Sequence, residues 1–198
     1  MTSKPSLILG SSSPYRKELL ERLHVKFTTD SPQVDETPLK EETPRDLSLR
    51  LSRLKARAVA QKHPGCVVIG SDQVLDLEGK CVGKPGNREN CIKQLEEMSG
   101  KTLIFHTAMT VIDSNGLGHS AVVDTTIKMK ELKRETIEAY VDLEQPFNCA
   151  GSAKLEKLGI CLIASFQSDD PTAIIGLGLI ELTSMLEKCG IEVLPGLK

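Results

Sequence analysis

The 198-residue sequence contains no tryptophan, and its only aromatic residues are two tyrosines and four phenylalanines. Proteins that bind single-stranded nucleic acid stack the bases on aromatic side chains, so this composition argues against that function. A formal net charge of −2 also provides no basic face for a nucleic-acid backbone. The expected partners therefore do not include nucleic acid.

Patterns typical of disulfide frameworks, metal sites and membrane segments are also missing. The six cysteines contain no CxxC pair, and the four histidines show no spacing typical of zinc ligands. The apolar run near the N-terminus is too short for a signal sequence or a membrane span. We therefore expect reduced thiols, no zinc site, no membrane partner and a cytoplasmic location.

Hydrophobic content of 39% and charged content of 26% are ordinary for a globular protein. Segments typical of strands alternate with segments that carry helix signals, which predicts an α/β fold. No repeat or long linker divides the chain, so residues 1–198 are expected to form one domain, with two lobes allowed. Strands are predicted at 7–10, 66–77, 102–112, 119–130, 159–166 and 191–194, and helices at 14–23, 44–63, 88–98, 135–143 and 177–189.

The stretch CVVIGSDQVL, which begins at Cys66, places polar residues in the middle of an apolar strand. Gly70 allows another backbone or a ligand to come close. Asp72 follows it near a strand end, where α/β enzymes often place catalytic groups. On this stretch alone, a carboxylate satisfied by local hydrogen bonds is an equally good interpretation.

The strand, turn and helix predicted from LILGSSSPYRKELL, residues 7–20, form a second candidate. Ser13 can cap the helix, Pro14 suits its first turn, and Arg16 and Lys17 follow. Free N–H groups and the positive end of the helix dipole make such a terminus a natural phosphate site. The GxxxxGK[ST] pattern of a P-loop is missing, and a well-capped helix without a ligand is the simpler alternative.

The helix predicted from residue 44 carries a lysine on its apolar side. Lys55 lies about 40° from Leu51 around the helix, whereas the arginines of this helix lie about 100° or more away. Two interpretations stay open for this side chain. The ammonium group points into a cleft toward an anion, or it extends along the apolar surface to reach water.

Two short loops add further charges. Lys84 precedes Pro85 on a rigid turn, and Asp35 and Glu36 are adjacent carboxylates that suit a hard cation. Each loop alone is typical of a solvated surface. Together with the other candidates, they supply cations for a polyphosphate and carboxylates for Mg²⁺, a combination used in metal-assisted cleavage of phosphoanhydrides.

The order of these motifs resembles that of the Maf family of nucleoside triphosphate pyrophosphatases. The motifs are SxSPxR, VDE, a helix lysine before alanine, GSDQV, GKP, and CAGS followed by a glutamate. The resemblance covers nearly the whole chain. It implies an elongated fold of the Maf/ITPase-like type, in which a mixed sheet with flanking helices forms two lobes around a deep cleft. It also implies a divalent metal cofactor, Mg²⁺ or Mn²⁺, and family members are often homodimers.

Roles implied by the resemblance follow the family motifs position by position. Asp72 matches the catalytic aspartate, usually assigned as the proton acceptor, and with Glu36 it would hold the metal. The residues expected to bind the substrate phosphates are Ser11, Ser13, Arg16, Lys17, Lys55 and Lys84. Lys17 stands where the family usually has arginine, so it offers a point charge instead of a planar fork.

Three positions that differ between the specificities of the family are Tyr15, Gln73 and Glu156 in this sequence. They resemble the YceF-type branch, which hydrolyses 7-methyl-GTP, more than the branch that takes dTTP and UTP. The Glu156 carboxylate can accept hydrogen bonds from N1–H and N2–H₂ of guanine, a donor pair that pyrimidines lack. Tyr15, where tryptophan is common, can stack on a methylated base that carries positive charge.

The expected function is hydrolysis of 7-methyl-GTP to 7-methyl-GMP and pyrophosphate, which removes a modified nucleotide. Two alternatives stay open at this point. One is a family member that hydrolyses dTTP or UTP, and the other is a nucleotide sensor in cell-division control that does not hydrolyse its ligand. The sensor fits the sequence less well, because a protein that only binds a nucleotide needs no catalytic base.

Overall fold

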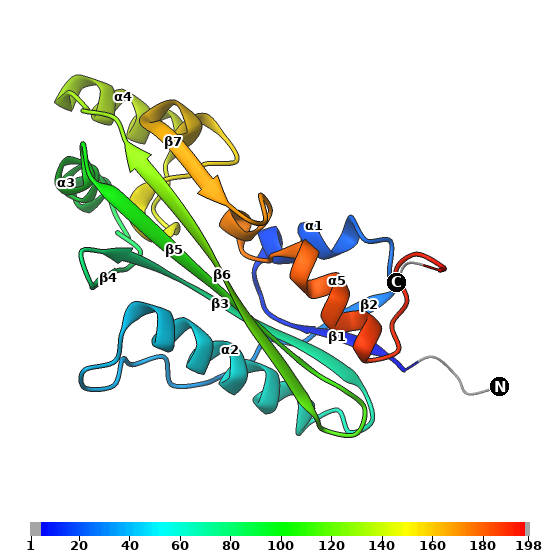
Figure 1. The fold of residues 1–198 in the computed structure, drawn as a ribbon. Coiled ribbons are helices and arrows are strands. Elements are labelled where there is room, and N and C mark those ends of the chain that lie inside the picture. Colours follow the sequence, from blue (N-terminus) through cyan, green and yellow to red (C-terminus); the bar gives the residue numbers. More distant parts are fainter. Residues whose placement is uncertain (1–4, 197–198) are drawn as a thin grey trace.

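The computed structural model describes residues 5–196 and shows an elongated molecule built on one mixed sheet (Figure 1). The strands are β1 (Leu7–Gly10), β2 (Phe27–Thr29), β3 (Val67–Leu77), β4 (Lys80–Val82), β5 (Thr102–Ile112), β6 (Gly118–Met129) and β7 (Ile163–Ser168). The α-helices are α1 (Pro14–Glu21), α2 (Pro44–Ala60), α3 (Arg88–Met98), α4 (Arg134–Glu144) and α5 (Leu179–Lys188). The predicted α/β class with a mixed sheet and flanking helices is confirmed.

The sheet is continuous through both ends of the molecule. Its strands are hydrogen-bonded in the order β2-β1-β3-β5-β6-β7, and the short β4 pairs with β3. β1 is parallel to β2 and β3, whereas β5 is antiparallel to both β3 and β6, and β7 is antiparallel to β6. β3 and β5 contain 11 residues each and β6 contains 12, so these three strands form the long central part of the sheet.

Local sequence signals set several helix ends. Thr43 caps α2 by accepting a hydrogen bond from the backbone N–H of Asp46 at 3.1 Å, and Pro44 occupies the first turn as predicted. α3 spans the predicted residues, and Gly100 follows it with φ of +69°, a left-handed conformation that favours glycine. Within residues 5–196, no helix combines the length and the apolar character needed to cross a membrane.

Two separate apolar cores lie on the same face of the sheet. Side chains alternate along a strand, and the odd-numbered residues of β3 and β5 point to this face. Ile69 and Met109 pack with α1 and α5, whereas Leu75 and Phe105 pack with α3 and α4. The polar side chains in the strip between the two cores are Ser71, Gln73 and Thr107. This interruption separates the two apolar cores, and the division of the domain into two lobes stays a prediction.

α2 covers the opposite face of the sheet and lies very close to β3. Ser52 and Ala56 of α2 are small and fully buried, and they contact the backbone at Gly70 of β3. A β-carbon added at Gly70 would lie 2.4 Å from the nitrogen of Ala56 and 2.5 Å from the carbonyl oxygen of Ser52. Only glycine allows so close an approach. The approach also fixes the position of Lys55, the residue before Ala56.

Two of the predicted strands were wrong in whole or in part. Residues 159–166 were predicted as a strand, but they begin in a 3₁₀ helix, η2 (Leu158–Leu162), and only then enter β7. Residues 191–194 follow α5 as irregular chain instead of forming a strand. The short β2, which was not predicted, is stabilised by parallel pairing with β1. In such short segments, tertiary neighbours outweigh intrinsic propensity.

Replacing Gly70 with alanine should destabilise the fold. The added methyl group would force α2 away from β3 and cost about 1–3 kcal/mol of unfolding free energy, as overpacking typically does. Thermal denaturation measures this loss. Gly118→Ala is the matched control, because Gly118 also lies in a strand but a β-carbon there meets only one atom, at 3.9 Å. Equal denaturation midpoints for the two variants would contradict the close packing.

Candidate active site

A hollow of about 980 Å³ lies between the β1–α1 loop, α2, β3 and the loop that follows β4. Its polar lining residues include Ser11, Ser13, Arg16, Glu36, Lys55, Asp72, Gln73, Lys84 and Asn148. The structure therefore brings together nearly all residues predicted to contact the phosphates or the metal, although they come from widely separated parts of the chain.

An ion cluster of one lysine and two carboxylates lies in this hollow. The Lys55 ammonium nitrogen is 2.6 Å from Oδ1 of Asp72 and 2.7 Å from Oε1 of Glu36. The Lys55 and Asp72 side chains are only 10% and 11% exposed, whereas that of Glu36 is 60% exposed. The ammonium group thus ends among carboxylates that line the cleft. This agrees with the interpretation that Lys55 points into a cleft and does not extend along the apolar surface to water.

The electrostatic state of Asp72 reflects opposing effects. Burial raises the pKa of the Asp72 carboxyl group, because removal from water disfavours its charged form. The charge and hydrogen bond of Lys55 lower that pKa, as does the charge of Arg16, while Glu36 raises it further. Burial is the largest of these effects, so the net shift is upward. Such a carboxylate accepts a proton more readily than an exposed aspartate does.

The β1–α1 loop is held in shape by hydrogen bonds from its own backbone. Oγ of Ser11 accepts from the N–H of Ser13 at 3.1 Å, and Oγ of Ser13 accepts from the N–H of Arg16 at 3.4 Å. Nε of Arg16 donates to the carbonyl oxygen of Gly176 at 3.2 Å, which orients the guanidinium group. Burial lowers the pKa of Arg16, although Asp72 and Glu36 oppose this shift. A guanidinium stays protonated even so.

The two remaining lysines predicted to bind phosphate differ in their positions. Lys84 lines the hollow, and no other residue within 5–196 forms an ion pair with it. Lys17 does not line the hollow; its side chain is 57% exposed and lies 3.6 Å from Glu21, one helical turn away. A phosphate contact by Lys17 therefore stays a prediction without geometric support.

The donor set suits a divalent cation only if the substrate contributes oxygen atoms. Across the described residues, no group of three or more histidine, cysteine, aspartate or glutamate side chains is arranged to hold a metal ion. Glu36 and Asp72 form a pair of carboxylates at one point of the cleft, both in contact with Lys55. Mg²⁺ is commonly held by one or two carboxylates together with substrate phosphates and water. The pair fits that mode of binding.

A second hollow, of about 200 Å³, adjoins the first. Both hollows are lined by Ser13, Tyr15, Arg16, Gln73, Lys84, Asn148 and Ala150. Tyr15, Gln73 and Glu156, the three predicted specificity residues, all line the smaller hollow. Burial raises the pKa of Tyr15, and the nearby Cys149 and Glu156 raise it further. A ligand with a flat ring and a polyanionic tail could occupy both hollows at once.

Sequence reasoning missed the segment 173–176, of which Ile174, Ile175 and Gly176 form one wall of the smaller hollow. The segment contains the 3₁₀ helix η3 (Ala173–Ile175) and is bound to the polar strip of the sheet. Oγ of Ser71 donates to the carbonyl of Gly176 at 2.9 Å, and Oγ1 of Thr107 donates to that of Ala173 at 2.9 Å. The alternation of Ser71 and Gln73 within an apolar strand was an available signal, but Thr107 and the 173–176 segment had none.

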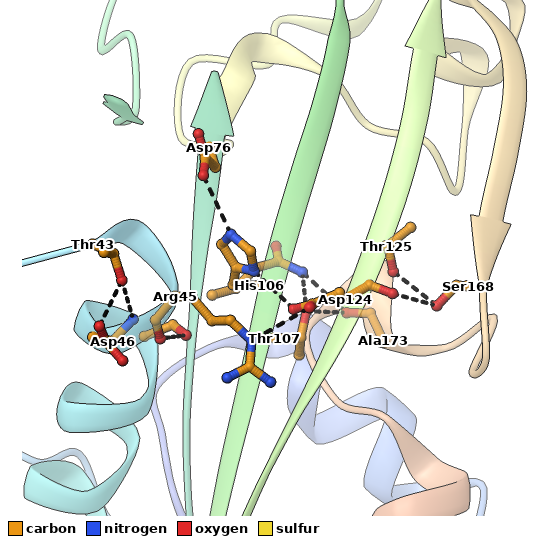
Figure 2. Close-up of polar contacts among 12 residues, drawn as sticks. Thr43, Arg45, Asp46, Asp76, His106, Thr107, Asp124, Thr125, Ser168 and Ala173 are labelled. Carbon is orange, nitrogen blue, oxygen red and sulfur yellow. Dashed lines mark hydrogen bonds and ion pairs between the residues drawn. The ribbon is translucent and has the colours of Figure 1, made fainter. Parts of the chain in front are cut away.

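A chain of polar side chains crosses the α2 face of the sheet (Figure 2). Nδ1 of His106 lies 2.7 Å from Asp124, and its Nε2 lies 3.5 Å from Asp76. Nε of Arg45, in the first turn of α2, donates to Asp124 at 3.3 Å. These contacts join the start of α2 to β3, β5 and β6. They help to hold the helix that carries Lys55 in place over the sheet.

Comparisons with known proteins agree with this geometry. A family model described as Maf-like protein matches residues 6–189. The 7-methyl-GTP pyrophosphatase of Cupriavidus pinatubonensis is 51% identical over 190 residues, 96% of this chain and 96% of that protein. The 7-methyl-GTP pyrophosphatase of Bordetella pertussis is 53% identical over 192 residues, 97% of this chain and 96% of that protein.

Among solved structures, the Staphylococcus aureus Ham1 protein aligns with a TM-score of 0.48 and 15% identity, over 65% of this chain and 73% of that chain. A nucleoside-triphosphatase (dITP/XTP pyrophosphatase) from Mycobacterium abscessus aligns with a TM-score of 0.42 and 18% identity, over 64% and 75%. The family model and the two relatives, by contrast, cover nearly the whole chain at high similarity. The chain belongs to the Maf family.

Proposed function

We propose that this chain hydrolyses 7-methyl-GTP to 7-methyl-GMP and pyrophosphate by cleaving the bond between the α- and β-phosphates. The observation that carries the proposal is the ion cluster of Lys55, Asp72 and Glu36 in a cleft that continues into a small hollow lined by Tyr15 and Glu156. The names of relatives that cover nearly the whole chain give further support.

The triphosphate is proposed to lie in the larger hollow and the base in the smaller one. Arg16, Lys55 and Lys84 provide positive charge, and Ser11 and Ser13 provide hydroxyl groups in the loop before α1. Lys17, outside the lining, would add only long-range attraction for the anionic substrate. Because both lobes line the cleft, we also propose that the whole chain acts as a single domain.

In the proposed reaction, a water oxygen bonds to the α-phosphorus while a proton of that water moves to Asp72. The bond between the α-phosphorus and the bridging oxygen breaks, and pyrophosphate leaves with that oxygen. Oδ1 of Asp72 is bound to Lys55, whereas no described residue donates a hydrogen bond to Oδ2, which is the proton acceptor in this scheme. Lys55 and Arg16 stabilise the negative charge that develops on the phosphate oxygens.

Glu36 and Asp72 are the residues proposed to hold a divalent cation, Mg²⁺ or Mn²⁺. Polarisation of the phosphate oxygens is the chemistry that such a cation supplies when bound. We propose the cytoplasm as the site of action, because nucleoside triphosphates are found there. A homodimer stays a prediction.

Asp72→Asn should lower kcat by about 10²–10⁴-fold, the usual contribution of a general base, while nucleotide binding persists. The measurement is pyrophosphate release from 7-methyl-GTP with Mg²⁺ or Mn²⁺ present, together with binding by calorimetry. Asp142→Asn is the control for loss of a carboxylate, because the Asp142 side chain is 56% exposed, pairs with Arg88 and lies outside the lining of the cleft. Near-native turnover of Asp72→Asn would exclude Asp72 as the base.

The acid side of the pH profile should report the ionisation of Asp72. Because the reaction needs the carboxylate and burial raises its pKa, kcat/KM should fall as pH decreases through a pKa above the ordinary value of 3.8. Lys55 lowers this pKa, so Lys55→Met should move the acid limb to higher pH. The same variant should lose about 2–5 kcal/mol of transition-state stabilisation.

Lys62→Met is the control for this experiment, because the Lys62 side chain is 54% exposed and pairs with Asp30 away from the cleft. Its pH profile should match that of the parent protein. If Lys55→Met retained normal kinetics and lost only thermal stability, Lys55 would be a structural residue and the proposed role would be wrong.

Glu156→Gln should reduce the preference for guanine. One acceptor oxygen becomes an NH₂ donor that faces the N–H donors of the base, so the ratio of kcat/KM for 7-methyl-GTP over UTP should fall at least about tenfold. Glu97→Gln, on the exposed side of α3, is the control for a general loss of charge. An unchanged ranking of 7-methyl-GTP, GTP and UTP in Glu156→Gln would remove the main physical support for base recognition.

A further inference from the structure

The amide nitrogen of Gln73 is surrounded by hydrogen-bond acceptors. Nε2 lies 2.9 Å from Oγ1 of Thr107, 3.0 Å from the carbonyl oxygen of Ala173 and 3.1 Å from that of Ile174. Oγ1 of Thr107 in turn donates its own proton to the carbonyl of Ala173 at 2.9 Å (Figure 2). Since that proton is already committed, the hydroxyl can only accept from Gln73.

These partners determine which way the amide group faces. Backbone carbonyl oxygens cannot donate a hydrogen bond, so only the NH₂ end of Gln73 can face Ala173 and Ile174. The opposite orientation would set Oε1 against two carbonyl oxygens and leave them without this donor. Gln73 therefore presents its oxygen, and not its nitrogen, to the remaining space around it.

That oxygen is open to the ligand hollows. Gln73 lines both of them and is half-buried. No residue within 5–196 donates a hydrogen bond to Oε1 of Gln73. If this oxygen were fully buried, it would be a buried polar atom without a partner, but in that range only Oε1 of Glu187 is such an atom. The Gln73 oxygen is therefore accessible, and it can only accept a hydrogen bond.

The acceptors of the smaller hollow match one particular base edge. The Glu156 carboxylate offers two acceptor oxygens, and no described residue forms a hydrogen bond or an ion pair with its side chain. Oε1 of Gln73 adds a third acceptor oxygen to the two of Glu156. The edge of guanine that carries N1–H and the 2-amino group has three N–H donors. Inosine lacks the amino group, and xanthine has a carbonyl acceptor in its place.

We infer that Gln73 recognises the 2-amino group of the base through Oε1, and that Thr107 is a positioning residue that holds the Gln73 amide in this orientation. The preferred substrates are then purine nucleotides with a donor at C2. This inference rests on the proposed function, because it assigns the base to the smaller hollow. It adds a requirement at one atom of the base, which substrate analogues can test separately.

The experiment compares kcat/KM for the triphosphates of 7-methylguanosine, 7-methylinosine and 7-methylxanthosine, which carry a donor, a hydrogen atom and an acceptor at C2. The parent protein should rank them in that order, with at least about a tenfold preference for 7-methyl-GTP over 7-methyl-ITP. A better rate with 7-methyl-XTP than with 7-methyl-ITP would overturn the inferred orientation of Gln73.

Two variants separate recognition from positioning. Gln73→Met, which keeps the length of the side chain but has no acceptor oxygen, should lower the 7-methyl-GTP/7-methyl-ITP ratio by about threefold to tenfold. Thr107→Val, of nearly the same shape, should lower it in the same direction by a smaller factor. Thr107→Ser retains the hydroxyl group and should restore the ratio of the parent. A merely structural role of Thr107 would reduce both rates together and leave the ratio unchanged.

The outcomes distinguish this inference from the proposed function. If the parent protein does not hydrolyse 7-methyl-GTP, the proposed function fails. If it does, but Gln73→Met keeps the parent ratio, Gln73 does not recognise the amino group. If only Thr107→Val keeps the parent ratio, the positioning role of Thr107 is wrong. Should Thr107→Val fail to fold, Gln73→Met still decides whether the amino group is recognised, and Thr107→Ala tests the positioning role in its place.

Discussion

The contact between α2 and the backbone of β3 at Gly70 is the constraint on which the rest of the site depends. Lys55 immediately precedes Ala56, which touches Gly70, and Asp72 lies two residues beyond it on the strand. Once helix and strand are pressed together, the ammonium group reaches the carboxylate at 2.6 Å. A bulkier residue at this point would separate the two charges and leave each of them partly buried without its partner, a costly arrangement.

Side chains alternate between the two faces of the sheet along β3, so the neighbouring residues Asp72 and Gln73 have different surroundings. Asp72 points toward α2 and its lysine, whereas Gln73 points to the other face, where Thr107 and the 173–176 segment surround it. That face carries two apolar cores separated by the polar strip. Side chains of the strip donate hydrogen bonds to backbone carbonyls of the 173–176 segment. The residues proposed for phosphate chemistry and for base recognition are thus adjacent, because they lie on opposite faces of one strand.

Charge balance in the cleft follows from the same packing. Burial makes the Asp72 carboxylate more basic, and Lys55 limits that effect while it keeps the carboxylate oriented. Arg16 is oriented by the carbonyl of Gly176, which also accepts from the strip residue Ser71. The carbonyl of Gly176 therefore binds Arg16, which is proposed to contact phosphate, and it also belongs to the wall of the smaller hollow. The positions of the two hollows are linked through this group.

The sequence by itself determined the α/β class, the cap at Thr43, the boundaries of α3, the apolar side of α2 that contains Lys55, and the family motifs, because these depend on local periodicity and on residue order. Tertiary structure decided the rest. It replaced two short predicted strand segments by irregular or 3₁₀ chain, and it placed the 173–176 segment over Thr107. Short segments such as these take their positions from neighbours distant in sequence, and local pattern carries no information about those neighbours.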